Sequence, residues 1–302
     1  MKGLVMKSTG SWYDVLGEDG NKYACRVRGK IRLDDIRESN PVAVGDHVNF
    51  EMIDKAIVQI LPRENHMLRQ SVKKTGHSHV LAANLSQAML MATLARPRTS
   101  LGFIDRFLVA AESFRIPQVL VFNKKDLLRP HELDELTEVV KIYSDIGVRC
   151  FLLSTLYDDL SSLKSILQHK ITLLAGHSGV GKSTLLNKLI PGIKLRVSEI
   201  SNFSEKGTHT TTFAEMFQVD DDSFIIDTPG VKEWGLVDMG PEEISDYFPE
   251  MRDRRLNCKF GARCIHLQEP KCAVLDAVRS GEIALSRYEN YVSMVLGEDN
   301  RK

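Results

Sequence analysis

The chain has 302 residues, 43% of them hydrophobic, which is enough for two or three domains with their own cores. Lysine plus arginine and aspartate plus glutamate both total 40, so whole-chain charge gives no argument for a nucleic-acid partner. No apolar run approaches the ~18 residues of a membrane span, and the first residues lack the apolar core of a signal peptide. These features argue against a membrane or secreted protein, and we expect a cytoplasmic monomer.

The N-terminal part, up to about residue 65, shows short alternating polar and apolar runs separated by turn signals. The turn signals lie at residues 17–20, 40–41 and 45–46. Strands at this spacing predict a small β-barrel of the oligonucleotide-binding (OB) type, which has about five strands. We expect this OB-like barrel over residues 1–66.

Two segments are locally basic. Side chains two residues apart on a strand lie on the same face. In one predicted strand every second residue is basic, so these side chains would share a face: Arg26, Arg28, Lys30 and Arg32. Residues 252–263 carry five basic residues and one acid, a local net charge of +4. Either segment could contact a phosphate backbone, although a solvated face is the simpler interpretation of each one alone.

From about residue 84 strands and helices alternate, which is typical of a mainly parallel sheet. Strands are expected at residues 87–95, 118–122, 148–153, 171–175 and 223–226. Apolar residues at helical spacing predict a helix over 101–114, and Pro117 follows its end. We expect this α/β domain over residues 67–234 and a mainly helical domain over 235–302.

Residues 176–183, Gly-His-Ser-Gly-Val-Gly-Lys-Ser, fit the phosphate-binding loop G-x-x-x-x-G-K-[ST]. A predicted strand precedes this segment and a helical pattern over 183–190 follows it, as the motif requires. The glycines allow a tight turn that presents backbone N–H groups to phosphate. We expect Lys182 to reach the β- and γ-phosphates and the Ser183 hydroxyl to bind Mg²⁺.

Asn123-Lys124-Lys125-Asp126 follows a predicted strand and fits the guanine-reading motif N-K-x-D. The Asp126 carboxylate can accept two hydrogen bonds from the ring N–H and the exocyclic amine of guanine. Adenine does not offer this pair, so GTP is expected in preference to ATP. Asn123 and Lys124 would brace the loop and cover the base.

Asp227 begins a D-x-x-G sequence after an apolar run. Its carboxylate is expected near Mg²⁺, and the Gly230 backbone N–H would sense the γ-phosphate. In the polar segment 206–212 a threonine would complete the Mg²⁺ shell; we favour Thr211 and leave Thr210 open. Val231 occupies the position of the water-orienting glutamine of Ras-like enzymes, and an apolar side chain cannot orient water.

His209 is therefore a candidate for positioning the attacking water, since an imidazole can accept a hydrogen bond near neutral pH. The other catalytic candidates are Lys182 and Thr211. The expected Mg²⁺ ligands are Ser183, Thr211 and Asp227. The residues expected to hold GTP or GDP are Asn123, Lys124, Lys125, Asp126, Ser154, Thr155, Gly176, His177, Ser178, Gly179, Val180, Gly181, Lys182, Ser183, Thr184 and Gly230.

Three of the five cysteines and one histidine follow the spacing C-x5-C-x-H-x5-C; they are Cys258, Cys264, His266 and Cys272. Three thiolates and one imidazole make a closed tetrahedral shell that suits Zn²⁺ and leaves no position for water. A structural zinc ion is therefore expected. Cys25 and Cys150 lie among strand-like residues and are expected as buried thiols.

The guanine motif precedes the phosphate loop, which reverses the order of ordinary GTPases and indicates a circularly permuted GTPase. With the predicted barrel and the C-x5-C-x-H-x5-C segment, the chain resembles the ribosome small subunit-dependent GTPase A family (RsgA, or YjeQ). The resemblance covers essentially the whole chain. His177 and Thr208 stand where a glutamine and an arginine are common in that family, at positions without an obligatory ligand.

The resemblance implies a late-stage assembly factor that binds the small ribosomal subunit and its rRNA, is stimulated by that subunit and leaves it on GTP hydrolysis. Because residues 227–230 connect almost directly to the zinc segment, a γ-phosphate contact there is able to shift the C-terminal domain. Two alternatives stay open: a permuted GTPase acting on the large subunit, and an RNA-binding scaffold that uses its nucleotide only for sensing.

Overall fold

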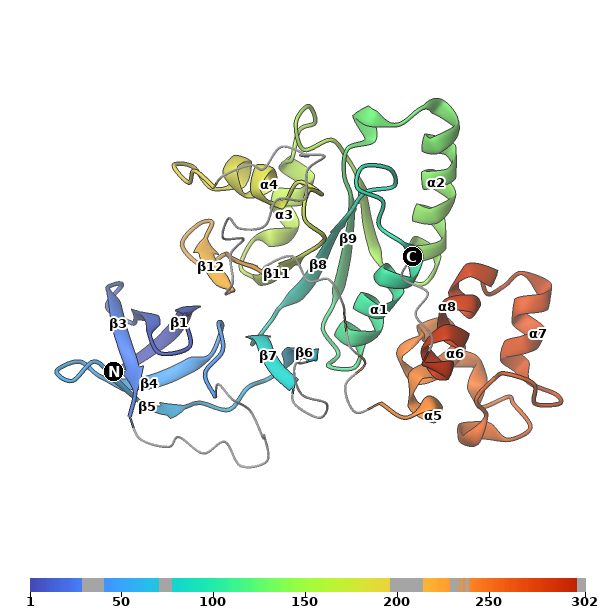
Figure 1. Ribbon diagram of the computed structural model, residues 1–302, viewed down its shortest axis with the longest axis horizontal. Coiled ribbons are helices and arrows are strands. Elements are labelled where there is room, and N and C mark those ends of the chain that lie inside the picture. The colour runs from blue at the N-terminus through green and yellow to red at the C-terminus, as the bar shows by residue number, and fades with distance from the viewer. Residues whose placement is uncertain are drawn as a thin grey trace, which may run out of the picture.

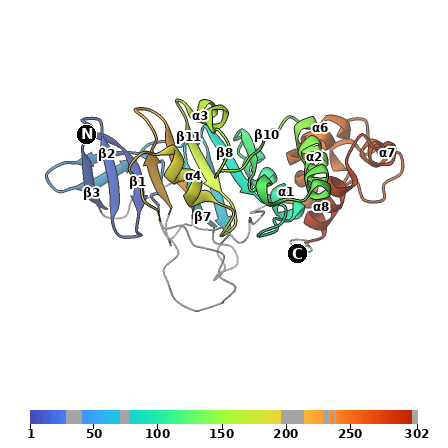
Figure 2. The same ribbon diagram turned by 90° about the horizontal axis from the view of Figure 1, so that it is seen from above.

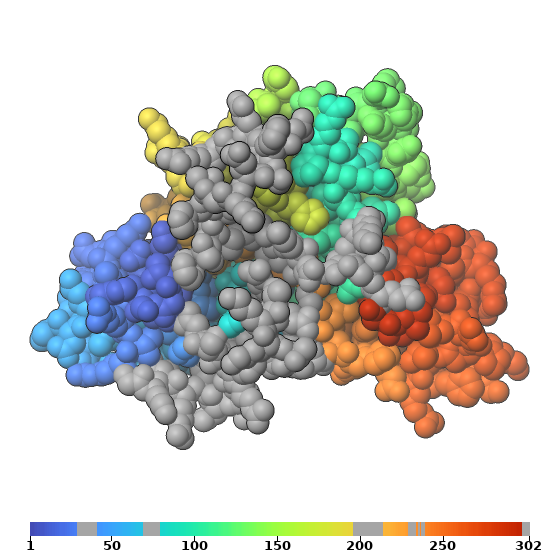
Figure 3. All heavy atoms as spheres, in the orientation of Figure 1, coloured from blue at the N-terminus to red at the C-terminus, as the bar shows by residue number. Residues whose placement is uncertain are grey.

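The computed structural model describes residues 1–28, 41–70, 78–195, 214–228, 234, 236 and 239–297. A β-barrel, an α/β core and a helical part follow one another along the chain. The barrel and the helical part lie at opposite ends, with the core between them (Figures 1 and 2). On the face seen in Figure 3 they form two separate ends of the molecule. The expected fold class is thereby confirmed.

Five strands close the barrel: β1 (Lys2–Ser8), β2 (Tyr13–Gly17), β3 (Lys22–Val27), β4 (His47–Glu51) and β5 (Ala56–Ile60). They are ordered β1-β2-β3-β5-β4, and β4 returns to pair with β1. Inward-facing side chains such as Val5, Val15 and Phe50 form its core. The Cys25 thiol is buried among them, as expected.

A parallel sheet ordered β10-β9-β8-β11-β13 forms the core, and β12 adds an antiparallel edge. Its strands are β8 (Gln87–Ala92), β9 (Gln118–Phe122), β10 (Arg149–Leu152), β11 (Ile171–Ala175), β12 (Glu215–Gln218) and β13 (Phe224–Asp227). Helices α1 (Leu101–Glu112) and α2 (Pro130–Asp145) pack on one face, and α3 (Ser161–Leu167) and α4 (Lys182–Leu189) on the other (Figure 1). Burial on both faces explains the continuous apolar runs in the sequence.

Three short strands were not predicted. β6 (His66–Gln70) and β7 (Ser78–Ala83) form a two-stranded sheet between barrel and core. β12 joins the two sheets through the pair Lys7–Glu215, whose side chains form an ion pair at 3.1 Å. β6 and β12, with the sequences HMLRQ and EMFQ, each contain only two consecutive apolar residues, too few for an apolar run to mark a strand.

The C-terminal part contains α5 (Pro241–Ile244), α6 (Pro249–Arg255), α7 (Ala273–Ser280) and α8 (Leu285–Leu296). Short 3₁₀ turns are η1 (Lys125–Leu127) in the core and η2 (Ser245–Tyr247) and η3 (Gly261–Arg263) here. Gly281, with φ of +80°, ends α7 because a left-handed residue satisfies the last helical carbonyls. Among the described helices, none is long and apolar enough to cross a membrane.

Candidate functional site

The phosphate loop joins the end of β11 to the start of α4. A Cβ on Gly176 would lie 2.4 Å from the Met91 carbonyl oxygen, and one on Gly181 would lie 2.4 Å from Nδ2 of Asn123. Both glycines also have positive φ, +147° and +112°. Only glycine fits these two positions, because both the backbone conformation and the neighbouring atoms exclude a side chain.

Lys182 opens α4 and is buried. Its ammonium donates to the carbonyls of Gly176 at 2.7 Å and His177 at 3.0 Å. Burial lowers the pKa of Lys182, and the nearby Asp227 carboxylate opposes that shift. The loop thus wraps around the lysine, which is therefore placed to meet any phosphate that the loop holds. Ser183 follows in the first turn and is half-buried.

Asp227 ends β13, the strand beside β11. Burial raises the pKa of Asp227 to about 6, with Lys182 opposing the shift and Glu215 adding to it. Its Oδ1 atom is buried, and no partner for it exists in the described part of the chain. Leaving a carboxylate oxygen buried without a partner is costly, and a divalent cation bound here would remove that cost. These features fit a Mg²⁺ ligand.

Several predicted residues fall outside the described residues. They are Thr208, His209, Thr210, Thr211, Gly230 and Val231. Their assignment to Mg²⁺, γ-phosphate or water therefore stays a prediction.

Asn123 ties the guanine motif to two other segments. Its Nδ2 donates to the Val180 carbonyl in the phosphate loop at 2.8 Å. Its Oδ1 accepts from the backbone N–H and the hydroxyl of Thr155, at 2.8 and 2.5 Å. The structure thus brings the N-K-x-D motif, the phosphate loop and the Ser154–Thr155 pair into one site.

Lys124 has a left-handed backbone, with φ of +64°, and its ammonium donates to the Gly179 carbonyl at 2.6 Å. The next residue, Lys125, pairs with Asp158 at 2.8 Å. Asp158 also accepts the Ser154 backbone N–H at 2.9 Å, which fixes the loop after β10. Asp126 is exposed, so its carboxylate is accessible to a base.

Two contributions to this site carry no sequence motif. The Arg96 carbonyl, in the segment between β8 and α1, accepts a hydrogen bond from Lys124 at 2.8 Å. Phe103 of α1 stacks on His177 of the phosphate loop, with ring centroids 4.0 Å apart. The sequence predicted a helix over 101–114 but carried no signal for which loop residue Phe103 would meet.

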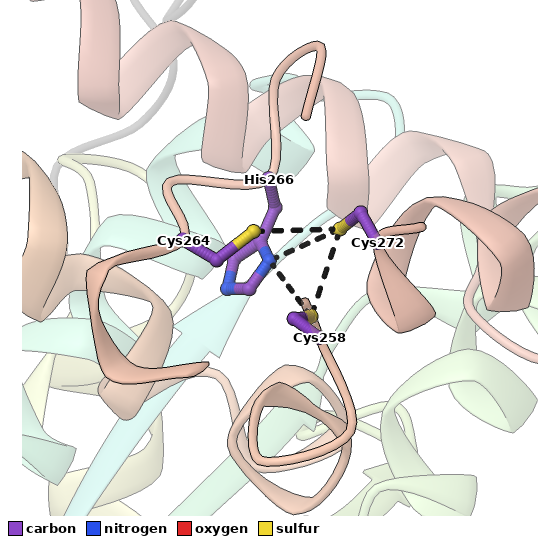
Figure 4. Close-up of side chains that lie close together, drawn as sticks. All are labelled: Cys258, Cys264, His266 and Cys272. Atoms are coloured by element: carbon purple, nitrogen blue, oxygen red, sulfur yellow. Dashed lines mark hydrogen bonds between the residues drawn. The ribbon is translucent and has the colours of Figure 1, made fainter. Parts of the chain in front are cut away.

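The zinc candidates form one cluster in which all ligand atoms lie within 4.8 Å of one another (Figure 4). The Cys272 sulfur lies 3.8 Å from the sulfurs of Cys258 and Cys264, and 3.3 Å from Nδ1 of His266. Thiolates about 2.3 Å from one tetrahedral ion would be about 3.8 Å apart. The residues present therefore fit a single structural Zn²⁺.

The peptide around His266 is fixed by hydrogen bonds from α8 and from Glu269. Tyr288 donates to the His266 carbonyl at 2.9 Å, and Tyr291 to the Ile265 carbonyl at 2.7 Å. Glu269 accepts backbone N–H groups, including that of Ile265 at 2.7 Å. Burial raises the pKa of Cys264 to about 12, and a bound zinc ion would offset this penalty by stabilising the thiolate.

Four of the nine basic residues noted in the sequence are paired with acids, and Lys30 and Arg32 lie outside the described residues. Arg28 bonds Glu51 at 2.6 Å and Asp54 at 2.9 Å. In the second segment the pairs are Arg252 with Glu112, Arg254 with Glu282, and Arg255 with Asp246. Lys259 and Arg263 are exposed. Each segment therefore has less unpaired positive charge available for a phosphate backbone than its sequence suggested.

Comparison with known proteins agrees with this architecture. A family model described as RsgA GTPase matches residues 60–237, and one described as RsgA N-terminal domain matches residues 2–58. A protein of Bacteroides fragilis named small ribosomal subunit biogenesis GTPase RsgA is 47% identical, covering 100% of this chain and 98% of its own. A similarly named protein of Christiangramia forsetii is 45% identical, covering 99% and 97%.

Two solved structures resemble the whole chain. YjeQ from Thermotoga maritima is 36% identical with a TM-score of 0.77, covering 99% of both chains. YloQ, described as a circularly permuted GTPase, is 31% identical with a TM-score of 0.72, covering 100% of this chain and 96% of its own.

Proposed function

The chain belongs to the RsgA family of GTP-hydrolysing enzymes, and from this premise we propose that it acts in the biogenesis of the small ribosomal subunit. One observation carries the proposal: relatives that share its full length are named for that role. We infer that it binds the subunit through rRNA late in assembly and that GTP hydrolysis releases it. We infer that the protein acts in the cytoplasm and as a monomer.

Several surface features support an RNA partner. Trp12 of the barrel is exposed, and the guanidinium of Arg26 lies 3.9 Å from its ring centroid. Aromatic and arginine planes are common stacking surfaces for unpaired bases. At the opposite end of the molecule, Lys259 and Phe260 are exposed beside the zinc cluster. Contacts from both ends would let the protein span a folded RNA surface.

Within the GTPase site, Asp126 reads guanine and Lys182 contacts the β- and γ-phosphates. Ser183, Thr211 and Asp227 hold Mg²⁺, and His209 positions water. The unpartnered Oδ1 of Asp227 supports the metal assignment. The contacts of Asn123 support the rest, since they hold the base-reading and phosphate-binding segments together.

The switch that starts at Asp227 controls the C-terminal domain. Trp234 lies near its end and is 1% exposed, packed against Phe107 of α1 with ring centroids 5.2 Å apart. The described residues on either side of 229–233 are thus fixed, Asp227 in β13 and Trp234 against α1. This position of Trp234 supports a domain boundary near residue 234, and we propose domains over 1–66, 67–234 and 235–302.

GTP turnover measured alone, with purified small subunits and with purified large subunits tests the proposal. We expect stimulation by small subunits, and Lys182→Ala serves as the inactive control. Stimulation only by large subunits would indicate that the protein acts on the large ribosomal subunit instead. The same rate under all three conditions would indicate a nucleotide sensor.

The switch is tested by the affinity for small subunits in each nucleotide state. We expect tighter binding with a non-hydrolysable GTP analogue than with GDP. Equal affinities would exclude nucleotide control, because a ligand shifts an equilibrium only through differential affinity.

A further inference from the structure

Helix α1 contacts the phosphate loop on one face and the zinc-binding C-terminal part on another. Phe103 stacks on His177 of the loop, with ring centroids 4.0 Å apart. Asp105, two residues further on, accepts a hydrogen bond of 2.6 Å from Arg287 of α8. Helical residues are rotated by about 100° from one to the next, so Phe103 and Asp105 point to nearly opposite sides. One helix therefore joins the two regions.

The contact with α8 is buried and densely bonded. Asp105 is 0% and Arg287 1% exposed. Arg287 also donates to Glu250 of α6 at 2.8 Å, and Asp105 also accepts from Asn290 at 2.5 Å and Tyr143 at 2.9 Å. A buried network of this kind resists partial rearrangement, since any group that loses its partner is left unsatisfied. α1 and the C-terminal part should therefore move together.

Two further contacts extend this attachment along α1. Val109, one turn after Asp105, is part of the hydrophobic core of the C-terminal part. Glu112, in the last turn, pairs with Arg252 at 2.6 Å. The attachment therefore covers the second half of the helix.

The start of α1 is connected to the phosphate loop by more than the aromatic pair. Lys124 donates to the carbonyls of both Gly179, in the loop, and Arg96, in the segment leading into α1. Pro97 in that segment is 3.6 Å from where a Cβ on Gly179 would lie. The His177 carbonyl itself accepts a hydrogen bond from Lys182. Displacement of α1 would thus disturb the residue that orients the phosphate-binding lysine.

We propose that Phe103 and His177 are positioning residues of the GTPase reaction, which set the shape of the phosphate loop from α1, and that the zinc-binding part influences nucleotide binding through this contact. The route is additional to the covalent connection through the switch. It predicts that the loop responds to changes at the α1–α8 contact, on the side of α1 that faces away from the loop.

Two variants of His177 test the loop side. His177→Ala removes the ring, and we expect it to weaken binding of GDP and of a non-hydrolysable GTP analogue about 2- to 10-fold, the contribution of an aromatic pair. KM for GTP should rise while kcat changes little, because the loop binds ground and transition states alike. His177→Phe keeps a stacking partner for Phe103 and should restore both values. Unchanged affinity and KM in His177→Ala would overturn the proposal.

Asp105→Asn tests the α8 side. Glu250 still neutralises Arg287 in this variant, so the fold should persist, and nucleotide affinity should fall at least about twofold. The matched control is Asp276→Asn, which breaks an exposed pair with Arg279 within α7 and should leave affinity unchanged. If Asp105→Asn does not fold, Arg252→Gln, which breaks the half-buried pair with Glu112, takes its place with the same expectation.

The double variant decides whether the effect passes through the aromatic pair. In the His177→Ala background, Asp105→Asn should cause a clearly smaller loss of affinity, because the aromatic contact is gone and only the contacts of Lys124 and Pro97 still join α1 to the loop. If Asp105→Asn lowered nucleotide affinity by the same factor in wild type and in His177→Ala, the two sites would act independently and the proposed route would be overturned.

Discussion

At the scale of residues, the site depends on side chains that hold one another in place. Asn123 has hydrogen-bond partners for both its amide nitrogen and its carbonyl oxygen, in the phosphate loop and at Thr155. A buried amide satisfied at both ends has one favourable orientation. Asp126, three residues on, is thereby presented on a defined turn with its carboxylate exposed. The exposed Asp126 carboxylate is thus placed by the contacts of the residues before it, Asn123, Lys124 and Lys125.

Replacement of Asp126 should change base preference. Asp126→Asn is expected to weaken GTP binding about 100-fold, because an amide donor would face the exocyclic amine of guanine. It should strengthen binding of xanthosine triphosphate, whose C2 oxygen accepts the hydrogen bond that the amide donates. Competition against fluorescent GDP measures both effects. A variant that still prefers GTP would show that another residue reads the base.

The raised pKa of Asp227 predicts a pH dependence of Mg²⁺ binding. Below about pH 6 this carboxyl group is protonated and cannot bind a cation, so Mg²⁺ affinity should fall as the pH is lowered through 6. The fall should approach about tenfold per pH unit at low pH. Mg²⁺ titrations of the nucleotide complex at pH 5.5 to 7.5 test this, with Asp227→Asn as the control. Equal pH dependence in wild type and variant would assign the titration to another group.

At the scale of elements, the zinc ligands lie on a segment with little regular structure. Cys258 and Cys264 flank the single turn η3, and Cys272 caps α7, its sulfur accepting the Leu275 N–H at 3.5 Å. The backbone hydrogen bonds within the loop between α6 and α7 are mostly short-range turns, such as Gly261 N–H to the Cys258 carbonyl, and do not form a regular ladder that would oppose chain entropy. A bound ion would supply that ordering energy.

Cys258→Ser is accordingly expected to lose zinc and to unfold the C-terminal part, because binding of a structural zinc ion is coupled to folding. Metal analysis and helical circular dichroism should fall together. Cys150→Ser, a half-buried cysteine outside the cluster, is the control and should keep both. A variant that retained helical structure without metal would show that the hydrophobic core alone holds this part.

At the scale of the molecule, the core is attached to its two neighbours in different ways. The core sheet continues into the barrel where β12 pairs with β1 at Lys7 and Glu215. The ion pair between these two side chains is partly exposed. The helical part instead packs a buried charge network onto α1, centred on Arg287. Surface ion pairs contribute little, whereas loss of one partner from a buried network is costly. The barrel also packs Met6 and Val44 into the hydrophobic core of the α/β domain, so the barrel is held mainly by apolar packing, and the C-terminal part by a buried charge network as well.

Arg287→Met should reduce stability by about 3–5 kcal/mol, because Asp105 and Glu250 would be left buried without their cation. Urea unfolding followed by circular dichroism would show a lower midpoint. Arg279→Met, at an exposed arginine of α7, should change the midpoint little. Similar midpoints for both variants would mean that water reaches the Asp105 carboxylate readily.

Much of the fold and the site was predictable because local chemistry dictates it. A phosphate loop needs glycines where the chain turns back, a guanine site needs a carboxylate, and a zinc shell needs thiolates at short spacing. Apolar runs marked the buried strands β9 and β11 with their exact bounds, since burial on both faces leaves few polar positions. These are properties of neighbouring residues, and a single sequence displays them.

What tertiary structure decided are the pairings between distant residues. Arg287 and Asp105 are 182 positions apart, and nothing near either one marks them as partners. The basic segments likewise looked available for nucleic acid until the fold placed acids such as Glu112 and Glu51 against them. A sequence shows which chemical groups are present, whereas the fold decides which of them meet in a medium of low dielectric constant and which remain in water. Charges interact more strongly in a low-dielectric interior than in water, so this partition sets how strongly each ion pair interacts. The connection from the zinc-binding part through α1 to the phosphate loop depends on such buried contacts, and it is visible only in the tertiary structure.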